Sequence, residues 1–458
     1  MKLRKIIPLL LMLVILIQLL CIPVAAQQED LQLKCGFAFL MDSDSGQILY
    51  EQNAYDKAYP ASMTKVMTGL LVLEALEAGT ITPDTLVTVS ELAATKEDHL
   101  ESSADLLAGE QMSVKDMMHC LLMPSANDAA RAFAEHLAGS LDAFVAMMNQ
   151  RAAELGCVNT HFNNVTGLHD PEHYTCAHDI TIIFREAMTH ALFRQAVSVA
   201  EYTTESTNLS GERNLVSLNS MITEAHYTGY LYEYCIGAKT GSTEEAGKCI
   251  VSAAKKGDST IVGVVMNAGV YYDEEGNEIQ GRFTEIIRLL DYGFDNYTKV
   301  NLTQPETPVA TVAVTLSKDG KEVGVVPQGS IPVLLSNDIP VEDIQTEITL
   351  FDETVEAPVN KGQVMGSMRL YYGDQTFGEL ELVAEEERSF SERLLKRQNR
   401  RAFWAKNWGW IVALPFILLL IACAGLVALR YYNIYKAKQR RKRRQAAREA
   451  ARRRAQTK

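Results

Sequence analysis

The sequence predicts a mixed α/β (α+β) fold with a helical region inserted into one antiparallel sheet, then a small all-β domain and one transmembrane helix. Three observations predict the first part. Two β-like runs surround Asp-Ser-Gly in residues 35–53, helical patterns dominate from Ser62 to about Ala200, and β-rich runs return in residues 237–269. A last helical pattern covers residues 282–297. The helices therefore separate the early and late strands of one sheet.

The first helix of the inserted region is expected from about Ser62. The residues after Lys65 are apolar on almost every side, and Gly79 offers a stop. A lysine near a helix start works against the macrodipole, which prefers acids there, so helix energetics alone do not account for Lys65. For an isolated Ser-x-x-Lys, a lysine that snorkels to the surface is the ordinary explanation, and the rest of the chain must decide.

Four further helical patterns fill the inserted region. They cover residues 113–122, 127–139, 140–156 and 179–197, with Ser113, Asn127 and Ser140 as expected N-caps and Gly156 as an expected stop. After them, a Lys-Gly-Asp-Ser turn at 256–259 joins two β-rich runs and predicts a hairpin.

An apolar segment lies near each end of the chain, and the two segments predict export and anchoring. Basic residues precede an apolar run that ends in small residues, which predicts a signal peptide cleaved after Ala26; an uncleaved anchor is the alternative. Residues 408–429 carry no charge and are long enough to cross the bilayer, and a core helix is the alternative there. The tail, 430–458, is heavily basic with the single acid Glu449, so it is expected in the cytoplasm, with the main domain outside.

The composition shifts define the expected domains. They are a signal peptide (1–26), a main domain (27–300), a β-sandwich-like domain (305–388), an amphipathic juxtamembrane linker (389–407) that suits the outer membrane surface, the span (408–429) and the tail (430–458).

Charge and cysteine content restrict the classes of partner. The net charge is −13 although the tail is basic, so the exported part is more acidic still, and capture of anionic polymers is not expected. Orientation of the span explains the tail more simply than nucleic-acid binding. Six of the eight cysteines lie in the exported part, where mostly free, buried thiols are favoured over disulfides. No CxxC motif or His/Cys cluster suggests a metal site, so no metal and no cofactor are expected.

Two further short motifs change the interpretation of Ser62. "PSAN" places Ser125 and Asn127 between two helices, and "KTG" places Lys239, Thr240 and Gly241 in a β-like run. Each is common by chance. In the order Ser-x-x-Lys, Ser-x-Asn, Lys-Thr-Gly, behind a signal peptide, they match the motif set of penicillin-recognising serine enzymes.

The chemistry explains the residue types. Lys65 lies one helical turn from Ser62 and can act as its base, because an apolar pocket and a second cation, Lys239, lower its affinity for a proton. Ser125 can relay a proton to a leaving amine, and Asn127 can orient Lys65 and the substrate amide.

The Lys-Thr-Gly strand supplies the remaining expected contacts. The backbone N–H groups of Ser62 and Ser242 suit an oxyanion, and Lys239 with the hydroxyls of Thr240 and Ser242 suits a terminal carboxylate. Gly241 allows a substrate to approach the strand closely.

The sequence resembles the D-alanyl-D-alanine carboxypeptidases, the low-molecular-mass penicillin-binding proteins. Beyond the motifs, the resemblance includes residues 163–180, 246–256 and 360–387, and it covers about 36–387. It implies a β-lactamase/penicillin-binding transpeptidase-like catalytic domain and removal of the terminal D-alanine from peptidoglycan stem pentapeptides through an acyl-enzyme. β-Lactams are then trapping inhibitors, and the partners are stem peptides and the membrane.

Departures from the family leave alternatives open. Ser242 stands where some members carry histidine, and Arg213 resembles a family arginine near the substrate carboxylate only loosely, so a surface arginine is the other interpretation. A class A β-lactamase needs a Glu-x-x-x-Asn setting, which Glu172 lacks. A non-enzymatic penicillin-binding sensor or scaffold is the second alternative, suggested by the span and basic tail.

Overall fold

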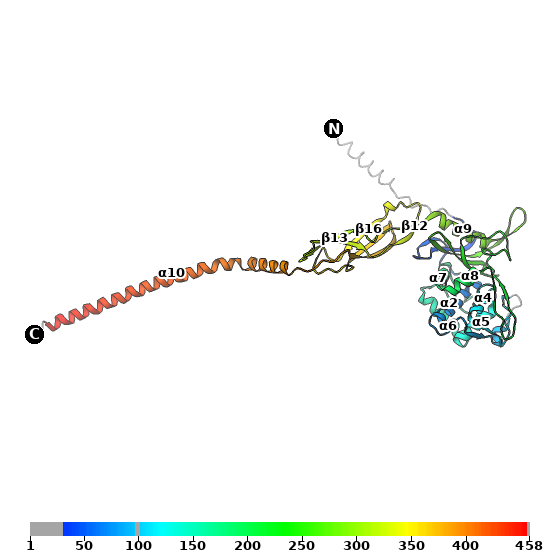
Figure 1. Ribbon diagram of the computed structural model, residues 1–458, viewed down its shortest axis with the longest axis horizontal. Coiled ribbons are helices and arrows are strands. Elements are labelled where there is room, and N and C mark those ends of the chain that lie inside the picture. Colours follow the sequence, from blue (N-terminus) through cyan, green and yellow to red (C-terminus); the bar gives the residue numbers. More distant parts are fainter. Residues whose placement is uncertain (1–30, 97–100, 456–458) are drawn as a thin grey trace, which may run out of the picture. The chain divides into compact units, whose positions relative to one another are not determined.

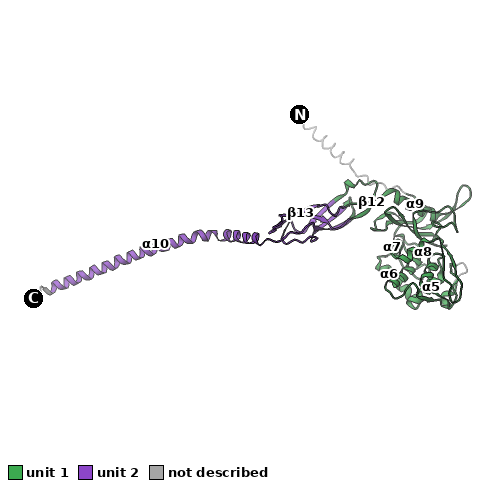
Figure 2. Ribbon diagram, in the orientation of Figure 1, with its two compact units in different colours: residues 1–302, 331–345, 371–377 green, residues 303–330, 346–370, 378–458 purple. Residues whose placement is uncertain are grey.

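The computed structural model describes residues 31–96 and 101–455, and the predicted signal peptide lies outside them. The chain forms two compact units (Figure 2). The first runs to Leu302 and also takes in Ile331–Gln345 and Tyr371–Phe377. The second comprises Thr303–Ser330, Thr346–Leu370 and the residues from Gly378 onward.

The first unit is built on a five-stranded antiparallel sheet with the strand order β2-β1-β9-β8-β7. The early hairpin joins the late strands through β1 and β9, where Leu40 pairs with Gly263. The insertion predicted from the sequence is therefore confirmed, and β7 is left at the edge of the sheet. The strands are β1 (Cys35–Asp42), β2 (Ile48–Gln52), β7 (Cys235–Thr243), β8 (Gly247–Lys256) and β9 (Ser259–Ala268).

The helices cover both faces of this sheet (Figure 1). Because strand side chains alternate, Phe39 packs into a core with the inserted helices, whereas Leu40 packs into a second core with α9. The helical elements are the 3-10 turn η1 (Ala61–Thr64), α2 (Lys65–Glu77), α3 (Glu91–Ala94), α4 (Val114–Leu122), α5 (Asn127–Ala138), α6 (Leu141–Glu154), α7 (Ala177–Ala187), α8 (Ala191–Ser198) and α9 (Gly281–Asn296).

Short two-stranded ribbons complete this unit. They are β3 (Leu86–Thr88) with β4 (Gln111–Ser113), β5 (Glu201–Thr203) with β6 (Asn214–Val216), β10 (Val270–Tyr272) with β11 (Glu278–Gln280), and β12 (Tyr297–Asn301) with β15 (Pro332–Ser336).

The helix caps and helix boundaries expected from the sequence are present, with two exceptions. Ser113 and Ser140 cap α4 and α6 by accepting hydrogen bonds from Asp116 and Ala143 N–H groups. Asn127 was predicted as a cap but is the first residue of α5; the N-cap is Ala126, and the Asn127 N–H donates to the Ser102 carbonyl. The pattern at 179–197 is two helices, α7 and α8, with the chain turning between Met188 and His190.

The second unit contains one six-stranded mixed sheet with the order β16-β18-β19-β14-β13-β17. Its apolar side chains, among them Val312, Val325, Met368 and Leu382, form a separate core. The strands are β13 (Ala310–Thr315), β14 (Glu322–Pro327), β16 (Gln345–Leu350), β17 (Thr354–Glu356), β18 (Val364–Tyr372) and β19 (Gln375–Ala384), and a short 3-10 turn, η2 (Val341–Asp343), precedes β16.

A single helix, α10 (Glu392–Ala455), follows this sheet. It is the one helix of the described residues that is long and apolar enough to cross a membrane. The segment expected as a separate juxtamembrane linker is therefore helical from Glu392 and continuous with the expected span. No proline or glycine interrupts residues 392–408, which explains the continuity.

Candidate active site

Ser62 lies in η1, immediately before the buried helix α2. Lys65 is the first residue of α2 and is completely buried. Its Nζ donates to Ser62 Oγ over 3.1 Å and to the Thr166 carbonyl oxygen over 2.7 Å. The placement predicted from Ser-x-x-Lys, with both side chains one turn apart and in contact, is present, and Lys65 does not snorkel to the surface.

Burial prepares Lys65 to act as a base. Desolvation lowers its pKa to about 7, against opposing contributions from the Glu101 and Asp128 carboxylates. Arg131 adds to the lowering. Lys239 was expected to contribute to this effect. Repulsion between the two amines is reciprocal, and at Lys239 it adds to burial: the pKa of Lys239 is held well below its ordinary value by burial and then by Lys65 and Arg282.

Ser125 and Lys239 form a second serine–lysine pair. Ser125 lies in the loop between α4 and α5 with φ +64°, a left-handed conformation. Lys239 on β7 is buried, and its Nζ donates to Ser125 Oγ over 2.9 Å and to the Thr240 carbonyl oxygen over 2.8 Å. The sequence motifs are thus brought together from a helix, a loop and an edge strand, and Asn127 is buried at the start of α5.

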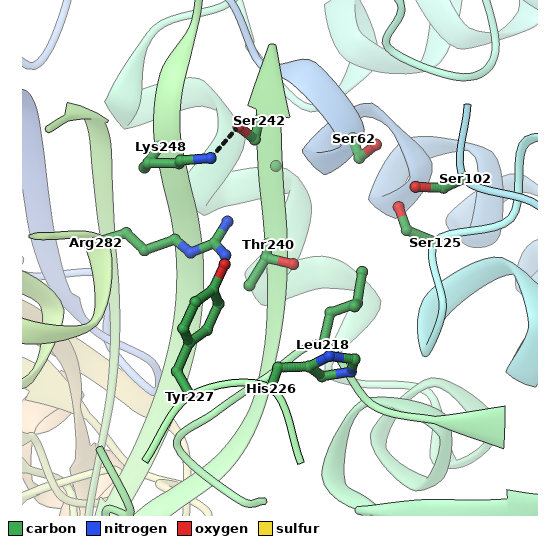
Figure 3. Close-up of a pocket in the computed structure, with 11 residues that line it drawn as sticks. Ser62, Ser102, Ser125, Leu218, His226, Tyr227, Thr240, Ser242, Lys248 and Arg282 are labelled. Carbon is green, nitrogen blue, oxygen red and sulfur yellow. Dashed lines mark hydrogen bonds between the residues drawn. The ribbon is translucent and has the colours of Figure 1, made fainter. Parts of the chain in front are cut away.

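Strand β7 packs directly on the turn that carries Ser62. A Cβ added to Gly241 would lie 2.9 Å from the Pro60 carbonyl oxygen and 3.1 Å from Ser62 N, so any larger residue forces the two apart. Between them opens a cavity of about 290 Å³ (Figure 3). Of the residues predicted from the sequence, it is lined by Ser62, Ser125, Thr240, Gly241 and Ser242.

Several residues that line this cavity belong to no motif that the sequence singled out. Arg282, in the first turn of α9, is 8% exposed, and its Nε has no hydrogen-bond partner among the described residues. Burial lowers its pKa. A cation at a helix start opposes the macrodipole, so the signal that singled out Lys65 was available here too. The remaining missed lining residues are Ser102, Leu218, His226, Tyr227 and Lys248.

Arg213 does not belong to the site. Its guanidinium makes a bidentate pair with the Glu110 carboxylate at 2.6 and 2.8 Å, and it does not line the cavity. The Glu110 side chain is fully buried and needs a cationic partner, which explains the position of Arg213. This pairing favours a structural part for Arg213 over the expected contact with a substrate carboxylate.

Two charged side chains of α5 bind the segment that carries Ser102. The Asp128 carboxylate accepts hydrogen bonds from the N–H groups of Ala104 and Leu106, at 3.1 and 3.0 Å. Arg131 pairs with Glu101 at 2.7 Å, with both side chains buried. Asp128 and Arg131 follow Asn127 on the same helix, so α5 positions the segment that brings Ser102 to the cavity.

One cluster away from the cavity resembles a metal site. Cys176, His178 and Asp179 bring their ligand atoms within 4.8 Å of one another at the start of α7. Asp179 already accepts hydrogen bonds from Asn159 N–H and the Thr160 hydroxyl, and burial raises the pKa of Cys176 to about 12. A protonated thiol and an occupied carboxylate account for the cluster without an ion. All seven described cysteines are free.

The fold and the two serine–lysine pairs define a serine enzyme of the penicillin-recognising class. Residues 23–270 match the Peptidase_S11 model, D-alanyl-D-alanine carboxypeptidase, and residues 297–389 match the C-terminal domain of penicillin-binding protein 5. The chain belongs to the D-alanyl-D-alanine carboxypeptidase family and is a serine peptidase.

Individual relatives agree with this assignment. The chain is 33% identical over 351 residues to D-alanyl-D-alanine carboxypeptidase DacF of Bacillus subtilis, with 76% of this chain and 85% of DacF covered. It is 31% identical over 372 residues to DacD of Escherichia coli, covering 80% and 89%. Penicillin-binding protein 5 of Haemophilus influenzae aligns in structure with a TM-score of 0.64 at 26% identity, covering 78% of this chain and 98% of that protein. The predicted fold class, catalytic domain followed by an all-β domain, is confirmed.

Proposed function

We propose that this carboxypeptidase removes the terminal D-alanine from peptidoglycan stem pentapeptides through an acyl-enzyme on Ser62. The observation that carries the proposal is the hydrogen bond from the buried Lys65 Nζ to Ser62 Oγ, with the pKa of Lys65 lowered to about 7 by burial. An amine of this kind takes a proton from a serine at neutral pH, whereas an exposed lysine does not.

In acylation, Lys65 takes the Ser62 proton and Oγ attacks the carbonyl carbon of the penultimate D-alanine. The negative charge that develops on the carbonyl oxygen is held by the N–H groups of Ser62 and Ser242. Gly241 supports this assignment, because the absence of a side chain keeps β7 within reach of the Ser62 turn. Asn127 is our candidate for orienting Lys65 and the substrate amide.

Expulsion of D-alanine requires a proton on the leaving nitrogen. Ser125 is our candidate donor, and Lys239, hydrogen-bonded to Ser125 Oγ, replaces that proton. The C–N bond breaks, the acyl group stays on Ser62, and water then hydrolyses the ester. A β-lactam opened by Ser62 leaves its amine tethered to the acyl group, which is why such compounds trap enzymes of this chemistry.

The terminal carboxylate of the substrate needs a cationic partner. Lys239, Thr240 and Ser242 are the candidates from the sequence, and the cavity adds Arg282, whose Nε is unpaired. Lys239 does not line the cavity, so we assign it an indirect part, through Ser125 and the strand, and assign direct contact to Thr240 and Arg282.

The test is release of D-alanine by the full-length protein in detergent. We expect release from a pentapeptide and covalent labelling by a fluorescent penicillin, with both absent in Ser62→Ala. Fast, repeated turnover of nitrocefin would favour a β-lactamase, and labelling without release would favour a sensor or scaffold. Neither is expected, because the relatives found are carboxypeptidases.

We further propose that α10 anchors the enzyme in the cell membrane, with residues 408–429 crossing it, the catalytic domain outside and the basic tail (430–458) in the cytoplasm. The apolar helix and its basic flank support this topology. We retain cleavage after Ala26. Protease added to intact spheroplasts should digest the catalytic domain and spare an epitope placed at the C-terminus; loss of the epitope would reverse the orientation.

A further inference from the structure

Four polar side chains meet on one face of the β7–β8 ribbon. Thr240 and Ser242 are two residues apart on β7 and therefore point to the same side. Lys248 on β8 is the register partner of Ser242, and its Nζ donates to Ser242 Oγ over 3.1 Å. Arg282 reaches the same cavity from α9 (Figure 3). Lys239 lies on the opposite side of β7, where its Nζ donates a hydrogen bond to Ser125 Oγ.

The charges on this face are not balanced. Lys248 and Arg282 both line the cavity, and no carboxylate is among the lining residues that the structure describes. The two cations are close enough to interact: the pKa of Lys248 is lowered by burial and then by Arg282. The Glu278 carboxylate opposes this lowering but does not line the cavity, so an anion bound in the cavity beside the two cations lowers the free energy of the site.

The arrangement also orients the hydroxyl of Ser242. Its oxygen accepts a hydrogen bond from Lys248, so its own proton remains available for an acceptor in the cavity. Thr240 offers a second hydroxyl on the same face. Two hydroxyl donors and two cations suit a carboxylate. Both cations, Lys248 and Arg282, are separate from the Ser125–Lys239 pair that delivers the proton to the leaving amine.

We propose that Lys248 is a specificity-determining residue for the terminal carboxylate, which it holds together with Arg282 and the hydroxyls of Thr240 and Ser242. The inference rests on the proposed carboxypeptidase function. A substrate with an amide at its C-terminus leaves both cations unpaired, so Lys248 favours peptides with a free end over blocked ones.

The test compares one peptide ending in free D-Ala-D-Ala with its C-terminal amide. In Lys248→Met, we expect KM for the free peptide to rise about tenfold with kcat changed less than about twofold, because a charge-assisted contact present in both ground and transition states is lost. The preference for the free peptide over the amide should fall by the same factor. Lys248→Arg keeps the charge and should restore most of both.

Lys255→Met is the matched control, since Lys255 lies exposed on the same strand and outside the cavity. It should behave as wild type, and melting curves of all variants verify folding. If Lys248→Met keeps the wild-type preference, the assignment to Lys248 is overturned. If wild type itself releases no D-alanine, the proposed function fails instead, so the two failures are distinct.

A pH series gives a second readout. KM of wild type for the free peptide should rise at alkaline pH as Lys248 loses its proton, because its pKa lies below the ordinary value. The rise should vanish in Lys248→Met and move to higher pH in Lys248→Arg. The charged and titratable groups that face Lys248 are Arg282 of α9, Glu278 of β11, Cys249 of its own strand, and His226 and Tyr227 across the cavity. A KM for the free peptide with the same pH dependence in wild type and in Lys248→Met would contradict the role of Lys248.

Discussion

Gly167 and Ala61 touch so closely that no side chain fits between them. A Cβ on Gly167 would lie 1.9 Å from the Ala61 carbonyl oxygen and 2.8 Å from Thr64 Oγ1, and Gly167 has φ +87°. Its neighbour Thr166 accepts the hydrogen bond from Lys65 Nζ. This glycine therefore sets how closely the wall of the site approaches the turn that carries Ser62.

Gly167→Ala should displace that turn. We expect the rate of acylation by a fluorescent penicillin to fall at least tenfold and the free energy of unfolding to fall by about 2 kcal/mol or more, from backbone strain and the clash together. Gly79→Ala is the matched control: its φ is also positive, +71°, but nothing lies within 4 Å of the added methyl group. It should cost about 1 kcal/mol and leave acylation intact. Equal effects of the two substitutions would contradict the steric argument.

Acylation should depend on pH through Lys65. The base must be neutral, and its pKa is lowered to about 7, so the second-order rate of penicillin labelling should fall about tenfold for each pH unit below 7 and level off above it. Because Lys65 and Lys239 repel each other, the midpoint belongs to the pair. Lys65→Met should fold and label orders of magnitude more slowly. A rate independent of pH between 5 and 8 would exclude Lys65 as the base.

Stability should fall in acid because of His173. Its ring accepts a hydrogen bond from Asn163 N–H and contacts Thr64 Oγ1 at 2.7 Å, and burial lowers its pKa to about 4. The unfolded chain then binds the extra proton between pH 6.5 and 4, so the free energy of unfolding decreases as pH falls through this range, by up to about 3 kcal/mol. Urea unfolding at pH 7.5, 5.5 and 4.5 measures this slope, and His173→Gln should flatten it. An unchanged slope in that variant would assign the effect to other groups.

The two arginines should respond differently to truncation. Arg213→Ala leaves the buried Glu110 carboxylate unpaired and should destabilise the protein by about 3 kcal/mol, without changing KM. Arg282→Ala removes a buried cation whose Nε has no hydrogen-bond partner, so stability should hold or rise while KM for a free C-terminus increases about tenfold. Thermal melting and peptide kinetics on both variants check this; a rise in KM for Arg213→Ala alone would restore its original assignment.

The sequence predicted those features that depend on local pattern. Ser62 and Lys65 share a helical turn, and Lys239, Thr240 and Gly241 share a strand, so motif spacing was enough to place them relative to one another. The sheet with inserted helices followed from the order of period-two and helical patterns. Ser113 and Ser140 were correct caps because a cap depends on a few neighbouring residues.

The features that failed depend on distant parts of the chain. Asparagine is a residue type that often caps helices, but the N–H of Asn127 donates to the Ser102 carbonyl. Ser102 precedes α4, so this contact is not local in the sequence. Arg213 forms an ion pair with Glu110, and no local sequence pattern connects these two residues. Lys248 and Arg282 meet only because β8 and α9 pack around the same cavity, so no spacing in the sequence connects them.

The position of β7 at the edge of its sheet has a consequence for the range of substrates. Within the described strands, β7 pairs with β8 on one side only, so the N–H and C=O groups of its outer side can join an extended peptide as an added strand. Such contacts engage the main chain, which is the same for every residue. We therefore expect the enzyme to accept stem peptides that differ in their upstream side chains, or in the bridges attached to them, as long as their free D-alanine terminus is kept.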